Sequence, residues 1–97
     1  MATYIVLCNY THQGIKSIKE APDRVKANDQ LAESCGAEMK DFYLTMGAHD
    51  TVAIIEAPGD QAATRFALAL AAAGNVRTTT LRAFTEQEFG EIVQSLP

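Results

Sequence analysis

Two imidazoles and one neighbouring carboxylate are the side chains of this sequence best suited to acid–base chemistry. His49 directly precedes Asp50, between two apolar stretches, and His12 follows the first apolar run. A carboxylate beside an imidazole sets its tautomer and raises its basicity, as a general base requires. We favour the simpler interpretation, in which Asp50 bonds the backbone of a turn and Gly47 takes a positive φ. His12 is likewise typical of a solvated or capping residue near a helix start.

A second set of polar side chains is suited to holding a ligand rather than reacting with it. Thr78, Thr80 and Arg82 alternate along one predicted strand, so they share a face, and a hydroxyl-lined face with an arginine can hold a carboxylate. Threonine is also a common strand residue, which favours a structural role. The remaining candidates are Tyr4 on the first predicted strand, Asn9 just after its end, and Tyr43 on the second strand. If the protein is an enzyme, Tyr43 or an arginine would stabilise the negative charge that develops in the transition state.

No spacing in the sequence predicts a metal site or covalent catalysis. Cys8 and Cys35 form no Cys-x-x-Cys pair, and neither histidine has a second ligand at helical spacing. Phosphate loops and serine nucleophile elbows are also missing from the sequence. We therefore expect no metal and no cofactor. The basic residues Lys16, Lys19, Arg24 and Lys26 are interrupted by acidic ones, which predicts a solvated face.

Length and charge limit the class of protein. Ninety-seven residues predict a single domain, residues 1–97, with a thin stability margin. The net charge of −4 argues against nucleic acid as a partner, because neutralising phosphates needs a clustered basic surface. The first residues lack the pattern of a signal peptide, and no apolar run approaches the ~18 residues of a membrane span. We expect no membrane contact and a cytoplasmic location.

The elements that must position these residues follow from apolar periodicity, caps and breakers. Thr11 and Pro22 predict the starts of a short and a longer helix, and Thr85 with Glu88 forms a capping box for a C-terminal helix. In that last helix Phe89, Ile92, Val93 and Leu96 mark a predicted buried face. The predicted strands are 4–8, 39–46, 50–57 and 76–84, and the predicted helices follow Thr11, Pro22, Asp60 and Thr85. This order predicts an α+β, ferredoxin-like βαββαβ fold with a four-stranded antiparallel sheet and a C-terminal helix.

The first and third predicted strands are apolar on both faces. Ile5 and Leu7 point away from Tyr4, Val6 and Cys8, while the helices of this topology cover one side of the sheet only. Exposing several large apolar side chains forfeits roughly 1.5–3 kcal/mol each. The sequence therefore predicts a homo-oligomer, a dimer or higher, formed through the sheet face. A C-terminal helix folded over that face is the alternative.

Four segments resemble the GYD-domain proteins, a family of small microbial proteins. The longest runs from Phe42 to Pro58, and Thr3–Leu7, Gly14–Lys16 and Gly74–Thr85 are similar too. The resemblance covers nearly the whole chain and implies a ferredoxin-like fold of the dimeric α/β-barrel type. It departs from the Gly-Tyr-Asp signature between Gly47 and Asp50, where His49 stands in place of the tyrosine. A role for that tyrosine hydroxyl therefore does not carry over.

The family resemblance implies no defined activity. The wider fold group includes cofactor-free monooxygenases, haem-binding enzymes, dehydratases and stress-responsive proteins, so fold alone selects none of them. Our leading hypothesis is an oligomer that binds a small organic molecule in a pocket between sheet and helices. One alternative is a cofactor-independent oxygenase- or isomerase-type enzyme with His49 or His12 as base. The other is a structural or regulatory subunit that only assembles.

Overall fold

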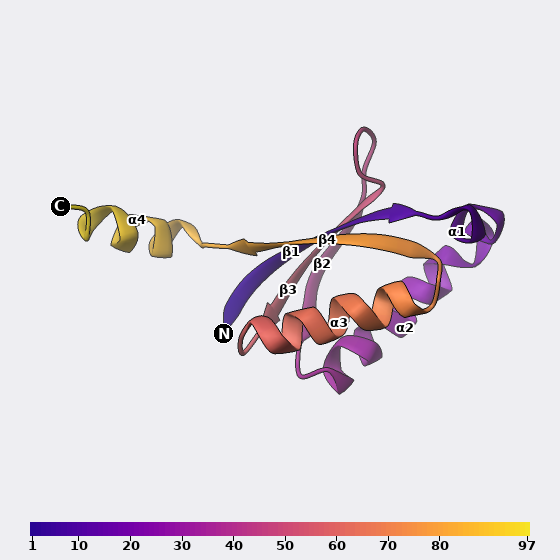
Figure 1. The fold of residues 1–97 in the computed structure, drawn as a ribbon, viewed down its shortest axis with the longest axis horizontal. Coiled ribbons are helices and arrows are strands. Elements are labelled where there is room, and N and C mark those ends of the chain that lie inside the picture. Colours follow the sequence, from indigo (N-terminus) through magenta and orange to yellow (C-terminus); the bar gives the residue numbers. More distant parts are fainter.

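The computed structural model describes residues 1–97, and the elements follow the predicted order (Figure 1). A 3-10 helix, η1, bridges the first two helices. The strands are β1 (Ala2–Tyr10), β2 (Glu38–Leu44), β3 (Thr51–Ala57) and β4 (Val76–Ala83). The helices are α1 (His12–Lys16), η1 (Ile18–Glu20), α2 (Ala21–Ser34), α3 (Asp60–Ala72) and α4 (Glu86–Gln94). The β2–β3 connection covers residues 45–50 and is longer than the three-residue loop that the sequence predicted.

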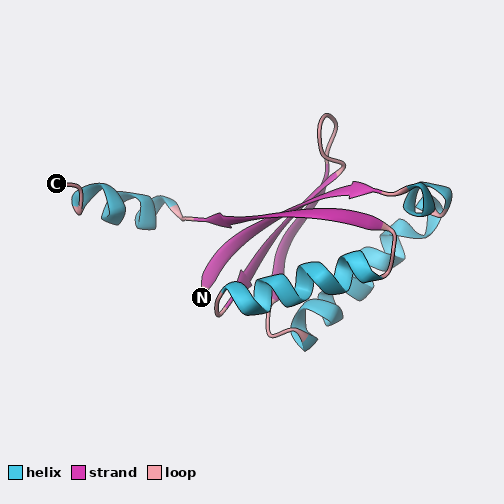
Figure 2. Ribbon diagram, in the orientation of Figure 1, coloured by secondary structure: helices cyan, strands magenta, loops and turns pink.

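All four strands form one antiparallel sheet in the order β2-β3-β1-β4, which confirms the ferredoxin-like prediction. The two central strands pair Tyr4 with Ile55 and Val6 with Ala53 on one face, and Ile5 with Ile54 on the other. Figure 2 shows α2 and α3 on the same side of this sheet. The chain therefore has two layers, with helices over one sheet face.

The core lies between the sheet and these two helices. Helix α3 supplies Phe66 from a face that also buries Ala63, Ala67 and Leu70, which fall at helical spacing. Phe66 meets the inward side chains Val6 and Ile55, and these three are the largest fully buried residues. The opposite sheet face has no helix over it.

We call this uncovered side the open face, and it is apolar at its centre. Its central side chains are Ile5, Leu7, Val52, Ile54 and Leu81, which the strand registers place on one side. Leu81 is 45% exposed, and Tyr43, at the edge on β2, is 58% exposed. Lys40 pairs with Glu38 and Glu56 at the margin of this face, at 3.2 and 3.4 Å. An apolar centre with a charged margin is the composition of a protein interface.

Helix α4 extends away from the sheet and covers no part of it, so the prediction of a buried helical face is wrong for the single chain (Figure 1). Phe89 and Leu96 are 62% and 64% exposed, and Ile92 and Val93 are also exposed. The reason is geometric: β4 continues straight into the capping box, and no turn returns the helix to the body. The radius of gyration is 14.5 Å, against about 12.5 Å for a compact chain of this length.

The capping box makes the start of α4 sensitive to acid. Glu88 accepts the backbone N–H of Thr85 at 2.9 Å, and this bond lowers the pKa of Glu88. A lowered pKa stabilises the cap above the unfolded value of about 4.3, and the contribution is lost as pH falls through the folded value. We expect the helicity of α4, followed by amide NMR shifts, to fall in that acidic range. Glu88→Gln keeps the capping geometry and should flatten this part of the titration. An unchanged pH profile in the variant would contradict the assignment.

Candidate functional site

Asn9, His49 and Asp50 meet where β1 and β3 join the 45–50 loop. Asn9 donates to the Ala48 carbonyl at 2.9 Å, and its amide oxygen lies 3.0 Å from Nδ1 of His49. In this pairing Nδ1 of His49 donates, because an amide oxygen only accepts. Asp50 forms no hydrogen bond with the imidazole. Its carboxylate instead accepts the backbone N–H of Tyr10 at 2.9 Å. The carboxylate therefore bonds the end of β1 and not the backbone of the 45–50 loop, while Gly47 takes the positive φ, 111°, that the turn interpretation expects.

Tyr4 lies toward the opposite end of β1, and Arg82 is its cross-strand neighbour on β4. The Tyr4 hydroxyl donates to Asp60 at 2.5 Å, and this bond raises the pKa of Tyr4 because phenolate would face a carboxylate. The Arg82 guanidinium lies 5.6 Å above the Tyr4 ring and 4.5 Å above Phe84, and 3.8 Å from Glu88. Arg82 is thus engaged in joining β4 to α4.

The remaining candidates lie elsewhere. Thr78, Thr80 and Arg82 share the helix-side face of β4, as alternation predicted, but Thr80 and Arg82 are exposed on this edge strand. Tyr43 lies on the open face, and His12 is exposed at the start of α1. From Tyr4 to Asn9 the strand rises roughly 16 Å, so the predicted residues do not converge on one site. No group of three histidine, cysteine or acidic side chains is arranged to hold a metal ion.

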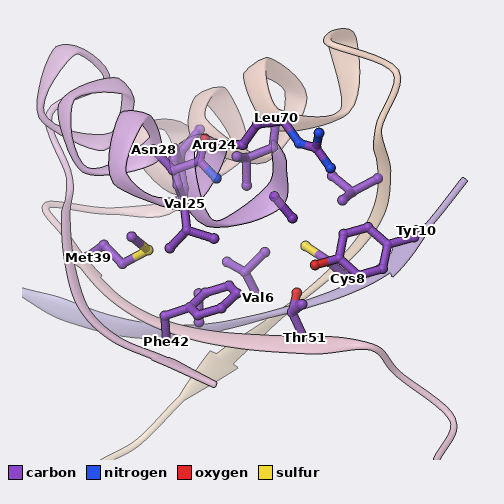
Figure 3. A pocket seen from close by; sticks show the side chains of 14 residues that line it. Val6, Cys8, Tyr10, Arg24, Val25, Asn28, Met39, Phe42, Thr51 and Leu70 are labelled. Carbon is purple, nitrogen blue, oxygen red and sulfur yellow. The ribbon is translucent and has the colours of Figure 1, made fainter. Parts of the chain in front are cut away.

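A cavity does lie between the sheet and the helices, at the place that the fold suggested (Figure 3). It measures about 50 Å³, and apolar side chains from β1, α2, β2 and α3 dominate its walls. None of the nine predicted site residues lines it. An open groove of about 450 Å³ adjoins it and shares Tyr10, Ala21, Val25 and Phe42. The cavity alone is too small for a metabolite, while the groove falls within the usual range of about 300–1,000 Å³.

Arg24 is the one formal charge in the cavity wall, and its guanidinium is only partly satisfied. Nη1 donates to the carbonyl and hydroxyl oxygens of Ser17 at 3.0 and 3.2 Å, with Glu20 at 4.0 Å. Nη2 is buried and has no hydrogen-bond partner. Burial raises the pKa of Tyr10, which lines both cavity and groove, so its hydroxyl stays a neutral donor. The expectation that Arg24 is part of a solvated basic face is therefore wrong.

Comparison with known proteins identifies the family of this chain. The model of the GYD domain matches residues 4–93. The chain belongs to the GYD-domain family. A relative from Thermus thermophilus, named "Glutamine synthetase and cystathionine beta-lyase binding protein", is 34% identical over 84 residues. The alignment covers 86% of this chain and 88% of that relative. No solved structure matches the chain significantly. No helix is both long and apolar enough to cross a membrane.

In this GYD-domain chain the residue pattern of α2 itself indicates that Arg24 faces the cavity. Ala21, Arg24, Val25, Asn28 and Ala32 fall at helical spacing, and the first four line the cavity. The apolar members of the stripe define the inward face of α2, so the polar members on that stripe must also point inward. The alternation of basic and acidic residues predicts solvent exposure for Arg24, whereas its position on this stripe predicts the cavity.

Proposed function

We propose that this GYD-domain protein is a small binding protein with a regulatory role, assembled from two or more copies through the open face. The single observation that supports this most is an apolar sheet face with no cover from its own chain. The accessible surface is 6463 Å², whereas a compact monomer of this mass exposes about 5,400 Å². The excess of roughly 1,000 Å² exceeds the about 800 Å² that each partner buries in a standard interface.

A two-fold arrangement suits the open face best. The centre of the face is apolar, while the acidic and basic side chains of Glu38, Lys40 and Glu56 stay at its margin. Stacking two such faces buries the apolar centres against each other and leaves the charges in water. The exposed apolar stripe of α4 extends beyond the sheet and is placed to contact the second copy.

A role in binding other proteins is supported by the relative from Thermus thermophilus, whose name states that it binds glutamine synthetase and cystathionine beta-lyase. We propose that this chain also binds metabolic enzymes, with these two as the first to test. In the assembly the partner enzyme contacts helices and strand edges, because the open faces lie between the copies. Two copies would engage a multi-subunit enzyme at two points, which raises apparent affinity without new contacts.

Purified glutamine synthetase and cystathionine beta-lyase from the organism that makes this chain provide the test. We expect at least one to bind immobilised wild-type protein in biolayer interferometry. The variant Ile54→Lys, designed to remain a single copy, should bind the same enzyme more weakly, because avidity is lost. Wild-type protein of confirmed oligomeric mass that binds neither enzyme would contradict this choice of partners.

Small-molecule binding is the second candidate function, and the groove beside the cavity supports it. Its walls are Tyr10, Ile18, Ala21, Pro22, Val25, Lys26, Phe42 and Leu44, which are mostly apolar. The enzyme alternative requires an imidazole at the pocket, and neither His12 nor His49 lines the cavity or the groove. Binding without a chemical step is therefore the simpler use of this site.

A further inference from the structure

We infer that Arg24 and Tyr10 form the head-group site for a small carboxylic acid whose apolar body lies in the groove between α2 and β2. This inference rests on the small-molecule candidate function and names its ligand class. It is independent of the assembly, because the groove lies on the helix side of the sheet and the open face on the other. Three features support it: a guanidinium with one unsatisfied nitrogen, a neutral donor in the same cavity wall and an apolar groove.

The partly satisfied guanidinium is that of Arg24. Ser17 holds Nη1 through its carbonyl and hydroxyl oxygens, and this fixes the orientation of the guanidinium plane. Nη2, in contrast, is buried without a partner. A buried donor left unsatisfied costs free energy, and an incoming oxygen recovers it. Glu20 does not supply that oxygen, because it lies 4.0 Å from Nη1 and its side chain is 77% exposed.

Tyr10 and Asn28 supply further polar atoms to the wall of the same cavity. Figure 3 shows the arginine side chain reaching toward the end of the cavity where Tyr10 lies. Burial raises the pKa of the Tyr10 hydroxyl, so it remains protonated and able to donate. One positive charge with one or two neutral donors matches the single charge of a carboxylate. A phosphate group needs more positive charge than this site offers.

The groove that would take the apolar body of the ligand adjoins the cavity. The cavity shares Tyr10, Ala21, Val25 and Phe42 with the groove, which continues past Ile18, Pro22 and Leu44 to solvent. Lys26 lies at its outer wall and attracts anions during approach. The groove of about 450 Å³ accommodates an aromatic or branched aliphatic chain. A short carboxylic acid with an apolar tail therefore gives Nη2 of Arg24 a hydrogen-bond acceptor and also fills the groove.

Phenylacetate and phenylacetamide are the probes, since they share a shape and differ in charge. Binding is measured by titration calorimetry and by amide NMR shifts at Val25 and Phe42. We expect wild-type protein to bind the acid at least about tenfold more tightly than the amide, the preference that a charge-assisted hydrogen bond provides. Arg24→Met should abolish the preference. Arg24→Lys should keep part of it, because a lysine retains the charge without the fork.

Glu20→Gln provides a second test, which does not depend on the folding of the Arg24 variants. It removes the exposed carboxylate near the guanidinium and should tighten binding of phenylacetate while leaving phenylacetamide unchanged. Equal binding of the two probes to wild-type protein would overturn the inference, as would shifts outside the groove. Absence of binding by either probe at millimolar concentration would also overturn it. Ile54→Lys should bind phenylacetate like wild type, which separates failure of this site from failure of the assembly.

Discussion

Replacing Ile54 with lysine should raise the dissociation constant of the assembly at least about a hundredfold, because the charge would be buried in an apolar interface without a partner. Ile54 lies on β3 at the centre of the open face, paired with Ile5. In the single chain its side chain is only partly covered, so a lysine extends its ammonium into water and the protomer stays folded. Light scattering coupled to size exclusion, over a concentration series, measures the shift.

Leu68→Lys is the matched control for this experiment. Leu68 is 66% exposed on α3, so the same change of chemistry takes place away from the open face. We expect its assembly to match that of wild type. The proposed interface is wrong if Ile54→Lys assembles normally, or if Leu68→Lys dissociates the protein to the same degree.

Gly14→Ala should destabilise the fold by roughly 3 kcal/mol, the upper part of the range for inserting a methyl group into a packed site. A Cβ at this position would lie 2.1 Å from the Asn75 carbonyl oxygen. That oxygen also accepts the N–H of Thr11 at 3.0 Å, and Thr11 donates to the Gly74 carbonyl at 2.6 Å. The contact joins backbone to backbone, so neither side can move without breaking the connection between α1 and β4. Thermal unfolding at fixed protein concentration measures the effect, as a loss of roughly 15 °C.

Gly90→Ala provides the comparison for Gly14→Ala. Gly90 lies within α4, where an added Cβ meets no atom within 4 Å. Alanine is the better helix former, so this variant should keep or slightly raise the melting temperature. Equal melting temperatures for Gly14→Ala and wild type would show that the contact with Asn75 yields easily, contrary to our expectation.

The fold was predictable because each of its breaks has a local physical cause. Thr11 caps α1 by accepting the N–H of Gly14, Pro22 lies in the first turn of α2, and the capping box begins α4. Alternation along β1 also predicted that Tyr4, Val6 and Cys8 share one face, and this is the face that the structure buries. These features depend on residues that are close in the sequence. Sequence patterns therefore identify them without knowledge of the tertiary structure.

The site was less predictable because it depends on contacts between distant segments. His49 and Asp50 are neighbours in the sequence, yet their side chains bond Asn9 and the Tyr10 backbone separately. The importance of Arg24 depends on Ser17 taking one of its nitrogens while burial isolates the other. Helix α4 shows the same limit, since its apolar stripe was predictable but its own chain leaves that stripe exposed.

Sedimentation equilibrium of the unmodified protein tests the central claim most directly. Association through the open face predicts, at micromolar concentration and neutral pH, a mass of at least twice that of the 10.5 kDa chain. The same association predicts that Ile54→Lys sediments as a single chain under these conditions. A wild-type mass of 10.5 kDa at high micromolar concentration would contradict the account, since the open face would then remain in water.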